Sequence, residues 1–113
     1  MRSKKINLTI TGCLGRMGQQ LIKSAVKDRR FKIQSLTENQ KINKKIAGIK
    51  PEFNNEKAFK KSDIIIDFTV PKCTLEVLRI AHKQKKRLII GTTGFSKKEE
   101  NIIKKYSKKI PIL

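Results

Sequence analysis

Short apolar runs alternate with helix-like periods along the chain. Residues 6–11 alternate apolar and polar side chains, as a strand does, and a glycine-rich segment follows at once. Residues 16–29 repeat apolar side chains every four positions, which predicts an amphipathic helix. The stripe of this helix contains Met17, Leu21 and Ala25, with Ile22 and Val26 beside it. Residues 31–37 return to alternation and predict a second strand.

The second half of the chain continues this alternation. Residues 63–68 form a compact aliphatic run, which is typical of a parallel strand buried on both faces. A proline at position 71 begins a helix that we expect to reach about residue 84. Residues 87–90 predict a fourth strand, and the capping box at residues 96–99 predicts the start of another helix.

Loop signals and a final apolar run complete the pattern. Glycine, proline and paired asparagines mark residues 39–62 as mostly loop, with a short helix over residues 56–61. Residues 110–113 predict a last strand at an edge or strand start, because the run contains a proline. Strands that alternate with helices predict a parallel sheet covered on both faces. We therefore expect one doubly wound, Rossmann-like α/β domain over residues 1–113.

The charge changes this picture little. The formal net charge is +19, but 22 of the 28 basic residues are lysines, and they are spread along the whole chain. No aromatic residues are interleaved with a basic stretch, which favours a solvated surface over a specific nucleic-acid interface. The longest aliphatic run is too short to span a bilayer, and the N-terminus lacks a signal-peptide pattern. We expect a cytoplasmic protein that binds no membrane.

Cysteine and histidine offer little chemistry. Cys13 and Cys73 form no metal-ligand pattern, so reduced thiols are expected. His82 borders a core-facing helical stripe and is interpreted as structural or exposed. Neither a metal site nor a catalytic acid–base or nucleophile set is predicted.

The sharpest motif lies between the first strand and the first helix, where residues 12–18 read GCLGRMG. Gly12 permits a tight turn, Gly15 permits close approach of a pyrophosphate to the backbone, and Gly18 permits close helix–strand packing. The amides of Gly15, Arg16 and Met17 are expected to face phosphate oxygens at the positive end of the helix dipole. The candidate pyrophosphate-binding residues are Gly12, Cys13, Leu14, Gly15, Arg16 and Met17. A structural turn without a ligand is the alternative.

Glu38 lies 20 residues after Gly18, at the end of the second predicted strand. A carboxylate there is able to accept hydrogen bonds from both hydroxyls of an adenosine ribose, and it disfavours a 2′-phosphate. Lys41, Lys44 and Lys45 follow closely and offset that repulsion. Both NADH and NADPH therefore remain candidate cofactors, and a solvated glutamate in a turn is the alternative.

Two further segments follow the third and fourth predicted strands. Residues 67–71 read DFTVP and residues 91–95 read GTTGF. Ligands of open α/β sheets bind at the carboxyl ends of the strands, so both segments are candidates for the nicotinamide side. Each is equally compatible with an ordinary turn.

Taken together, GCLGRMGQQL, DFTVP followed by Thr74-Leu75, and IIGTTGF resemble, in this order and spacing, the dihydrodipicolinate reductase family. The resemblance spans residues 6–113 and implies a nicotinamide-dependent reductase of lysine biosynthesis through diaminopimelate. Such an enzyme delivers a hydride to a cyclic unsaturated dicarboxylate. By resemblance, Gly12 through Met17 hold the pyrophosphate and Glu38 holds the adenosine ribose. The nicotinamide-side residues are Gly91, Thr92 and Thr93, with Phe68 and Thr69 nearby.

The resemblance also has departures. Some family members carry an arginine directly after the glutamate, whereas this chain has Asn39. Family members continue into a second domain that holds the substrate motifs and most oligomer contacts. We therefore expect the 113-residue chain to be the cofactor-binding domain alone, inactive unless the missing half is supplied, with few family oligomer contacts. The cofactor domain of another Rossmann dehydrogenase and a basic nucleic-acid-binding module are the alternatives.

Overall fold

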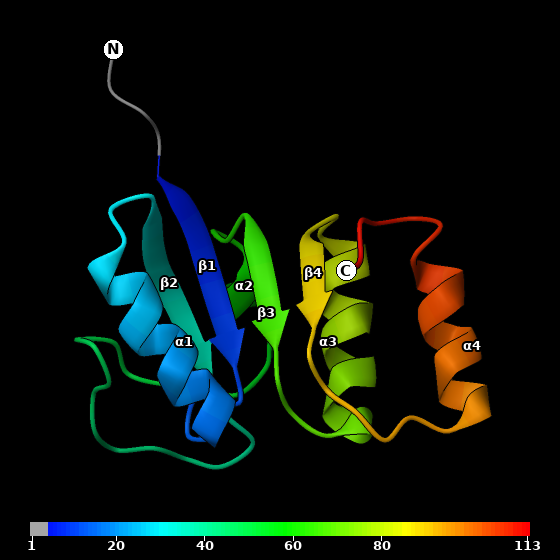
Figure 1. The fold of residues 1–113 in the computed structure, drawn as a ribbon, viewed down its shortest axis with the longest axis horizontal. Helices are drawn as coiled ribbons and strands as arrows, with labels where there is room; N and C mark the ends of the chain where they lie inside the picture. The colour runs from blue at the N-terminus through cyan, green and yellow to red at the C-terminus, as the bar shows by residue number, and fades with distance from the viewer. Residues whose placement is uncertain (1–4) are drawn as a thin grey trace.

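The computed structural model describes residues 5–113, and strands alternate with helices along them (Figure 1). The strands over residues 6–11, 31–37 and 87–90 have the predicted bounds, and the predicted capping box is present at the start of the last helix. The elements are β1 (Ile6–Thr11), α1 (Arg16–Lys27), β2 (Phe31–Thr37), α2 (Glu56–Phe59), β3 (Ile64–Asp67), α3 (Pro71–Lys83), β4 (Arg87–Ile90) and α4 (Lys97–Tyr106). None of the helices in this part of the chain is long and apolar enough to cross a membrane.

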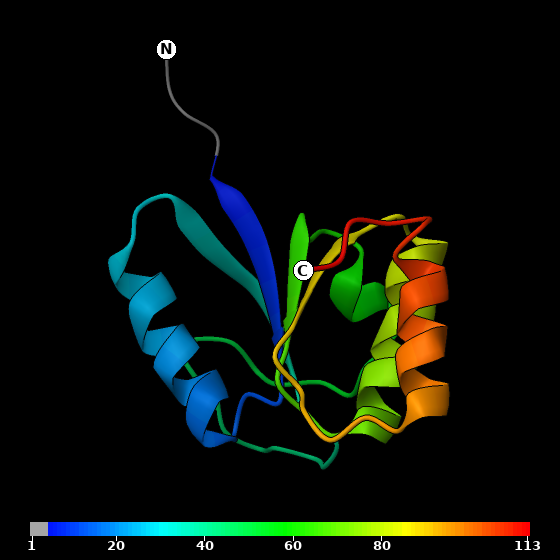
Figure 2. The ribbon, with the colours of Figure 1, turned by 45° about the vertical axis from the view of Figure 1, so that its right-hand side comes forward.

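The four strands form one parallel sheet in the order β2-β1-β3-β4. The chain moves from β1 outward to β2 and then crosses to β3 on the other side of β1. This reversal places the topological switch point beside the carboxyl end of β1, where the glycine motif follows. Figure 2 shows α1 on one face of the sheet and α2, α3 and α4 on the other. The doubly wound α/β fold is confirmed.

The face beneath α2, α3 and α4 carries the larger core. Ile65 of β3 and Leu88 of β4 point into it and are almost fully buried. The helices contribute Phe59, Val77, Leu78 and Ala81 to the same cluster. Burial of these aliphatic side chains is the main source of stability for this half of the molecule.

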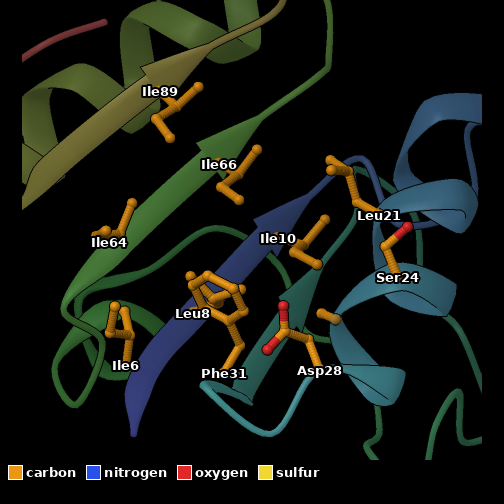
Figure 3. A pocket seen from close by; sticks show the side chains of 11 residues that line it. Ile6, Leu8, Ile10, Leu21, Ser24, Asp28, Phe31, Ile64, Ile66 and Ile89 are labelled. Carbon is orange, nitrogen blue, oxygen red and sulfur yellow. The ribbon is translucent and has the colours of Figure 1, made fainter.

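The opposite face is only half covered. Helix α1 lies over β1 and β2, and the buried cluster there contains Ile10, Cys13, Ile22 and Leu36. Beside α1, a groove of about 450 Å³ runs over β1, β3 and β4. Figure 3 shows Ile64, Ile66 and Ile89 lining it together with Leu8 and Ile10. We call this surface the apolar groove.

Two packing expectations are wrong on this face. Strand β3 alternates between buried and half-exposed residues instead of being buried on both sides, because no described helix covers Ile64 and Ile66. Met17 is 51% exposed, and Val26 is also exposed. The buried residues of α1 are Gly18, Ile22 and Ala25, and Leu21 packs against the same core, so the predicted stripe is wrong at Met17 and Val26.

The predicted last strand is present only as a short edge pairing. The Leu88 amide donates to the carbonyl of Pro111, and the Leu113 amide donates to the carbonyl of Leu88. A single parallel bridge, Leu88 to Ile112, results in place of a fifth strand. Pro111 has no N–H to donate, which is consistent with an edge position.

Candidate functional site

The turn after β1 requires glycine at two positions. Gly12 has a φ of +69°, and a Cβ there would lie 2.3 Å from the carbonyl oxygen of Phe68. A Cβ on Gly18 would lie 2.2 Å from the carbonyl oxygen of Gly12. Both distances are far below van der Waals contact, so any side chain would force the backbone apart. The motif therefore brings the start of α1 close against the ends of β1 and β3.

The first turn of α1 offers exposed amides. Gly15 is the N-cap and provides no side-chain cap. Its own amide donates to the carbonyl of Gly12 at 3.0 Å, whereas we expected it to face a ligand. The amides of Arg16 and Met17 belong to the first turn, where an α-helix leaves N–H groups without intrahelical acceptors. Both residues are exposed, so these donors lie at the surface beside the turn.

Glu38 lies beside the glycine turn, as expected from its place after β2. One carboxylate oxygen, Oε2, accepts from the Leu14 amide at 3.0 Å, and the other, Oε1, accepts from the Asn39 amide at 2.9 Å. A pocket of about 210 Å³ opens here. Its lining residues are Gly12, Gly15, Glu38, Asn39, Phe68, Thr69, Val70 and Cys73.

Cys13 points away from this pocket into the core. Its amide donates to the carbonyl of Thr37, and its side chain is fully buried beside Ile10 and Ile22. Burial, with a smaller contribution from the negative charge of Glu38, raises the pKa of the Cys13 thiol to about 11. The thiol is therefore neutral at physiological pH, and only the backbone of Cys13 lies in the turn.

The two segments predicted for the nicotinamide side meet behind the pocket. A Cβ on Gly91 would lie 1.8 Å from the ring of Phe68, so this ring lies directly against the Gly91 backbone. The Thr69 amide donates to Oγ1 of Thr92 at 2.9 Å. Thr92 is buried, and Thr93 is exposed.

The structure brings some predicted residues together and leaves others apart. Gly12, Gly15 and Glu38 line one pocket with Phe68 and Thr69. The described lining of that pocket does not include residues 91–93, although Gly91 lies against the ring of Phe68, which is part of the lining. His82 lies edge-on against Tyr106, with ring centroids 5.2 Å apart, on the α3–α4 side of the molecule.

Sequence reasoning included Asp67 in the candidate segment 67–71 but missed its role as a buried hydrogen-bond acceptor. Asp67 is fully buried at the end of β3, where it accepts hydrogen bonds from four threonine hydroxyls. The sequence signal for this network was an aspartate at the end of an aliphatic strand. The neighbouring strands β1 and β4 each have a threonine at or just after their carboxyl ends, Thr11 and Thr92. Among residues 5–113, no group of three or more His, Cys, Asp or Glu side chains is arranged to hold a metal ion.

Comparison with known proteins places this geometry in a family. A family model described as "Dihydrodipicolinate reductase, N-terminus" matches residues 6–113. A 4-hydroxy-tetrahydrodipicolinate reductase of Pelagibacter ubique (strain HTCC1062) is 67% identical over 110 residues, which cover 97% of this chain and 43% of that protein. The chain thus spans less than half the length of the curated relatives that it matches.

Solved structures agree on the fold. Dipicolinate-bound dihydrodipicolinate reductase from Paenisporosarcina sp. TG-14 superposes with a TM-score of 0.74 at 22% identity, covering 92% of this chain and 43% of that one. A homoserine dehydrogenase of S. aureus gives a TM-score of 0.78 at 18% identity, covering 96% of this chain and 31% of that one. Because two different enzymes superpose this well, the fold alone does not distinguish between them. The sequence match does, and the chain belongs to the dihydrodipicolinate reductase family, in which it corresponds to the N-terminal part.

Proposed function

We propose that the chain is the dinucleotide-binding part of a 4-hydroxy-tetrahydrodipicolinate reductase and binds NADH or NADPH at the carboxyl edge of the sheet. The observation that carries this proposal is the first turn of α1. Its amides have no side-chain cap, and Arg16 and Met17 are exposed residues. They adjoin a turn in which Gly12 and Gly18 leave no room for a Cβ and whose Leu14 amide donates to Glu38. This is the cradle that a pyrophosphate with an adjoining ribose requires.

Each group has a distinct task in this proposal. The amides of Arg16 and Met17 donate to pyrophosphate oxygens, and the Arg16 guanidinium adds a positive charge. Glu38 accepts from the ribose hydroxyls while it continues to hold the Leu14 and Asn39 amides, because each carboxylate oxygen has two lone pairs. Phe68 forms the wall on the nicotinamide side, and the Gly91 backbone supports its ring.

The cofactor supplies a hydride when bound, and the chain's own residues bind and orient it. The proposed acceptor, for the whole enzyme, is a cyclic unsaturated dicarboxylate. None of the described residues is assigned to bind that acceptor or to protonate it. His82, the one histidine of the chain, packs against Tyr106 instead of lining the pocket. In this proposal the chain contributes the cofactor side of the reaction only.

The test removes one amide proton without removing the helix. Arg16 occupies the first helical position, which tolerates proline, and Gly15 has φ −68° and ψ 162°, the conformation that a residue before proline prefers. Arg16→Pro deletes the amide donor and the charge, and Arg16→Ala deletes the charge alone. We expect Arg16→Pro to bind NADH about tenfold more weakly than Arg16→Ala.

Lys97→Pro is the matched control, because Lys97 is the first residue of α4 and Ser96 before it has a similar extended conformation. This variant should bind NADH as the wild type does. Binding is followed by the backbone amide shifts of Arg16 and Met17 in the wild type and by a titration curve in each variant. No shift at millimolar NADH and NADPH, or equal affinities of Arg16→Pro and Arg16→Ala, would contradict the proposal.

A further inference from the structure

Asp67 is a buried carboxylate whose partners are all hydroxyls. Its Oδ1 accepts from Oγ1 of Thr11 at 2.5 Å and from Oγ1 of Thr69 at 2.8 Å. Its Oδ2 accepts from Thr74 and, at 3.1 Å, from Oγ1 of Thr92. Neither of the ion pairs found within residues 5–113 includes Asp67. A buried carboxylate without a cation is costly unless its acceptor sites are satisfied, and these four donors fill them.

The four donors come from four different segments of the chain. Thr11 ends β1, Thr69 lies in the loop after β3, Thr74 lies in the first turn of α3, and Thr92 follows β4. These segments meet at the carboxyl edge of the sheet, and Asp67 accepts a hydrogen bond from each of them. Asp67 therefore acts as a common anchor for the loops of that edge.

The anchored segments carry the walls of the pocket. Thr11 directly precedes Gly12, whose Cα lies against the Phe68 carbonyl. Thr69 lines the pocket and donates its amide to Thr92, and Thr92 directly follows Gly91, which supports the Phe68 ring. Asp67 itself is fully buried and is not part of the lining. Its influence on a ligand must therefore pass through its partners.

We propose that Asp67 is a positioning residue for the dinucleotide: its carboxylate fixes the loop after β3 and the loop after β4 relative to the glycine turn. This inference rests on the proposed function, because it concerns the same site. It adds that affinity depends on a buried carboxylate that lies outside the pocket lining.

A second buried hydroxyl cluster provides the comparison that isolates this role. Oγ1 of Thr9 bonds to the hydroxyls of Ser35 and Ser62, and Ser35 donates to the carbonyl of Ala58. This cluster ties β1 and β2 to α2, lies away from the glycine turn and lines none of the pocket. Loss of a hydroxyl there removes a buried hydrogen bond without disturbing the loops of the carboxyl edge.

The experiment compares Thr74→Val with Thr9→Val in NADH titrations. Both residues are fully buried, both substitutions replace a hydroxyl with a methyl group, and neither residue lines the pocket. We expect Thr74→Val to weaken NADH binding about tenfold, because it removes one hydrogen bond to a charged, buried acceptor. Thr74→Ser keeps the hydroxyl and should restore affinity to within about twofold. Thr9→Val should leave affinity unchanged, although it destabilises the fold similarly.

Asp67→Asn removes the charged acceptor itself and should weaken NADH binding more than Thr74→Val does. In the free protein, the amide resonance of Thr69 should shift relative to the wild type, because Thr69 is bonded to this network. Thr74→Val keeps the inference testable if Asp67→Asn fails to fold. Equal affinities of wild type and Thr74→Val, or equal losses in Thr74→Val and Thr9→Val, would overturn the inference and leave the proposed function standing. Absence of NADH and NADPH binding by the wild type would overturn both.

Discussion

The two faces of the sheet are built from similar aliphatic residues but are covered to very different extents. Beneath α2, α3 and α4, Ile65 of β3 and Leu88 of β4 are almost fully buried, and Ile90 packs against the same cluster. On the other face, α1 covers β1 and β2, whereas β3 and β4 have no described helix over them and line the apolar groove. Ile65 and Ile66 are neighbours on β3, yet Ile65 is fully buried and Ile66 is half-exposed.

The comparison shows that a larger apolar hollow need not be the candidate ligand site. The groove has about 450 Å³ of space and is lined almost wholly by apolar side chains, with Ser24 and Asp28 as its polar residues. The pocket beside the glycine turn has about 210 Å³ and converging amide, carboxylate and hydroxyl groups. Polar groups fix the orientation of a ligand and give specificity. The smaller pocket is therefore the candidate site for a charged dinucleotide.

The largest expected effect is on the covered face. Ile65→Ala should lower the free energy of unfolding by about 2–5 kcal/mol, because it leaves a cavity between the sheet and α3 that cannot collapse. Urea unfolding followed by circular dichroism measures the change. A loss below about 1 kcal/mol would mean that this face is loosely packed.

A smaller effect is expected where α1 covers the other face. The folded chain keeps the Cys13 thiol protonated up to a pKa of about 11, whereas the unfolded chain ionises it near 9.0. The unfolded state therefore binds fewer protons between these values, and stability falls as the pH rises from about 9 to about 11. The loss attributable to Cys13 is on the order of 2 kcal/mol.

Cys13→Ala is the control for that measurement, because lysine titration affects both proteins alike. Urea unfolding at pH 8 and at pH 10.5 should show a steeper decline for the wild type than for the variant. Parallel declines would indicate that water reaches the thiol and that α1 does not seal its half of the face.

The smallest effect is expected in the groove. Ile66→Ala should cost about 1 kcal/mol or less, since the side chain is already half in water and leaves no closed cavity. The same substitution on adjacent residues of one strand thus measures the coverage of the two faces. If Ile66→Ala costs as much as Ile65→Ala, the groove is closed in solution by another surface.

Much of the fold was predictable because strands and helices leave local signals. Alternation predicted the bounds of β1 and β2, a short apolar run predicted β4, and the capping box predicted the start of α4. The wrong predictions concern which side chains are covered by another element. The coverage of β3 and the orientation of Met17 depend on how helices are placed over the sheet, which no local pattern contains.

The candidate site follows the same division. The glycine turn and Glu38 were predictable because their spacing reflects a strand, a turn and a helix in succession. Their proximity in one pocket agrees with that prediction, and their role as ligands remains a proposal. The Asp67 network was not predictable, because it joins hydroxyls from Thr11 to Thr92 that become neighbours only after the strands align.

The two amide contacts of Glu38 also affect attempts to change cofactor choice. Replacing this glutamate to admit a 2′-phosphate would remove the acceptor of the Leu14 amide as well as a negative charge. The glycine turn would then lose a stabilising hydrogen bond at the position proposed to bind the diphosphate. An engineered switch at residue 38 should therefore be paired with a substitute acceptor for that amide, or selectivity will be gained at the expense of affinity for either dinucleotide.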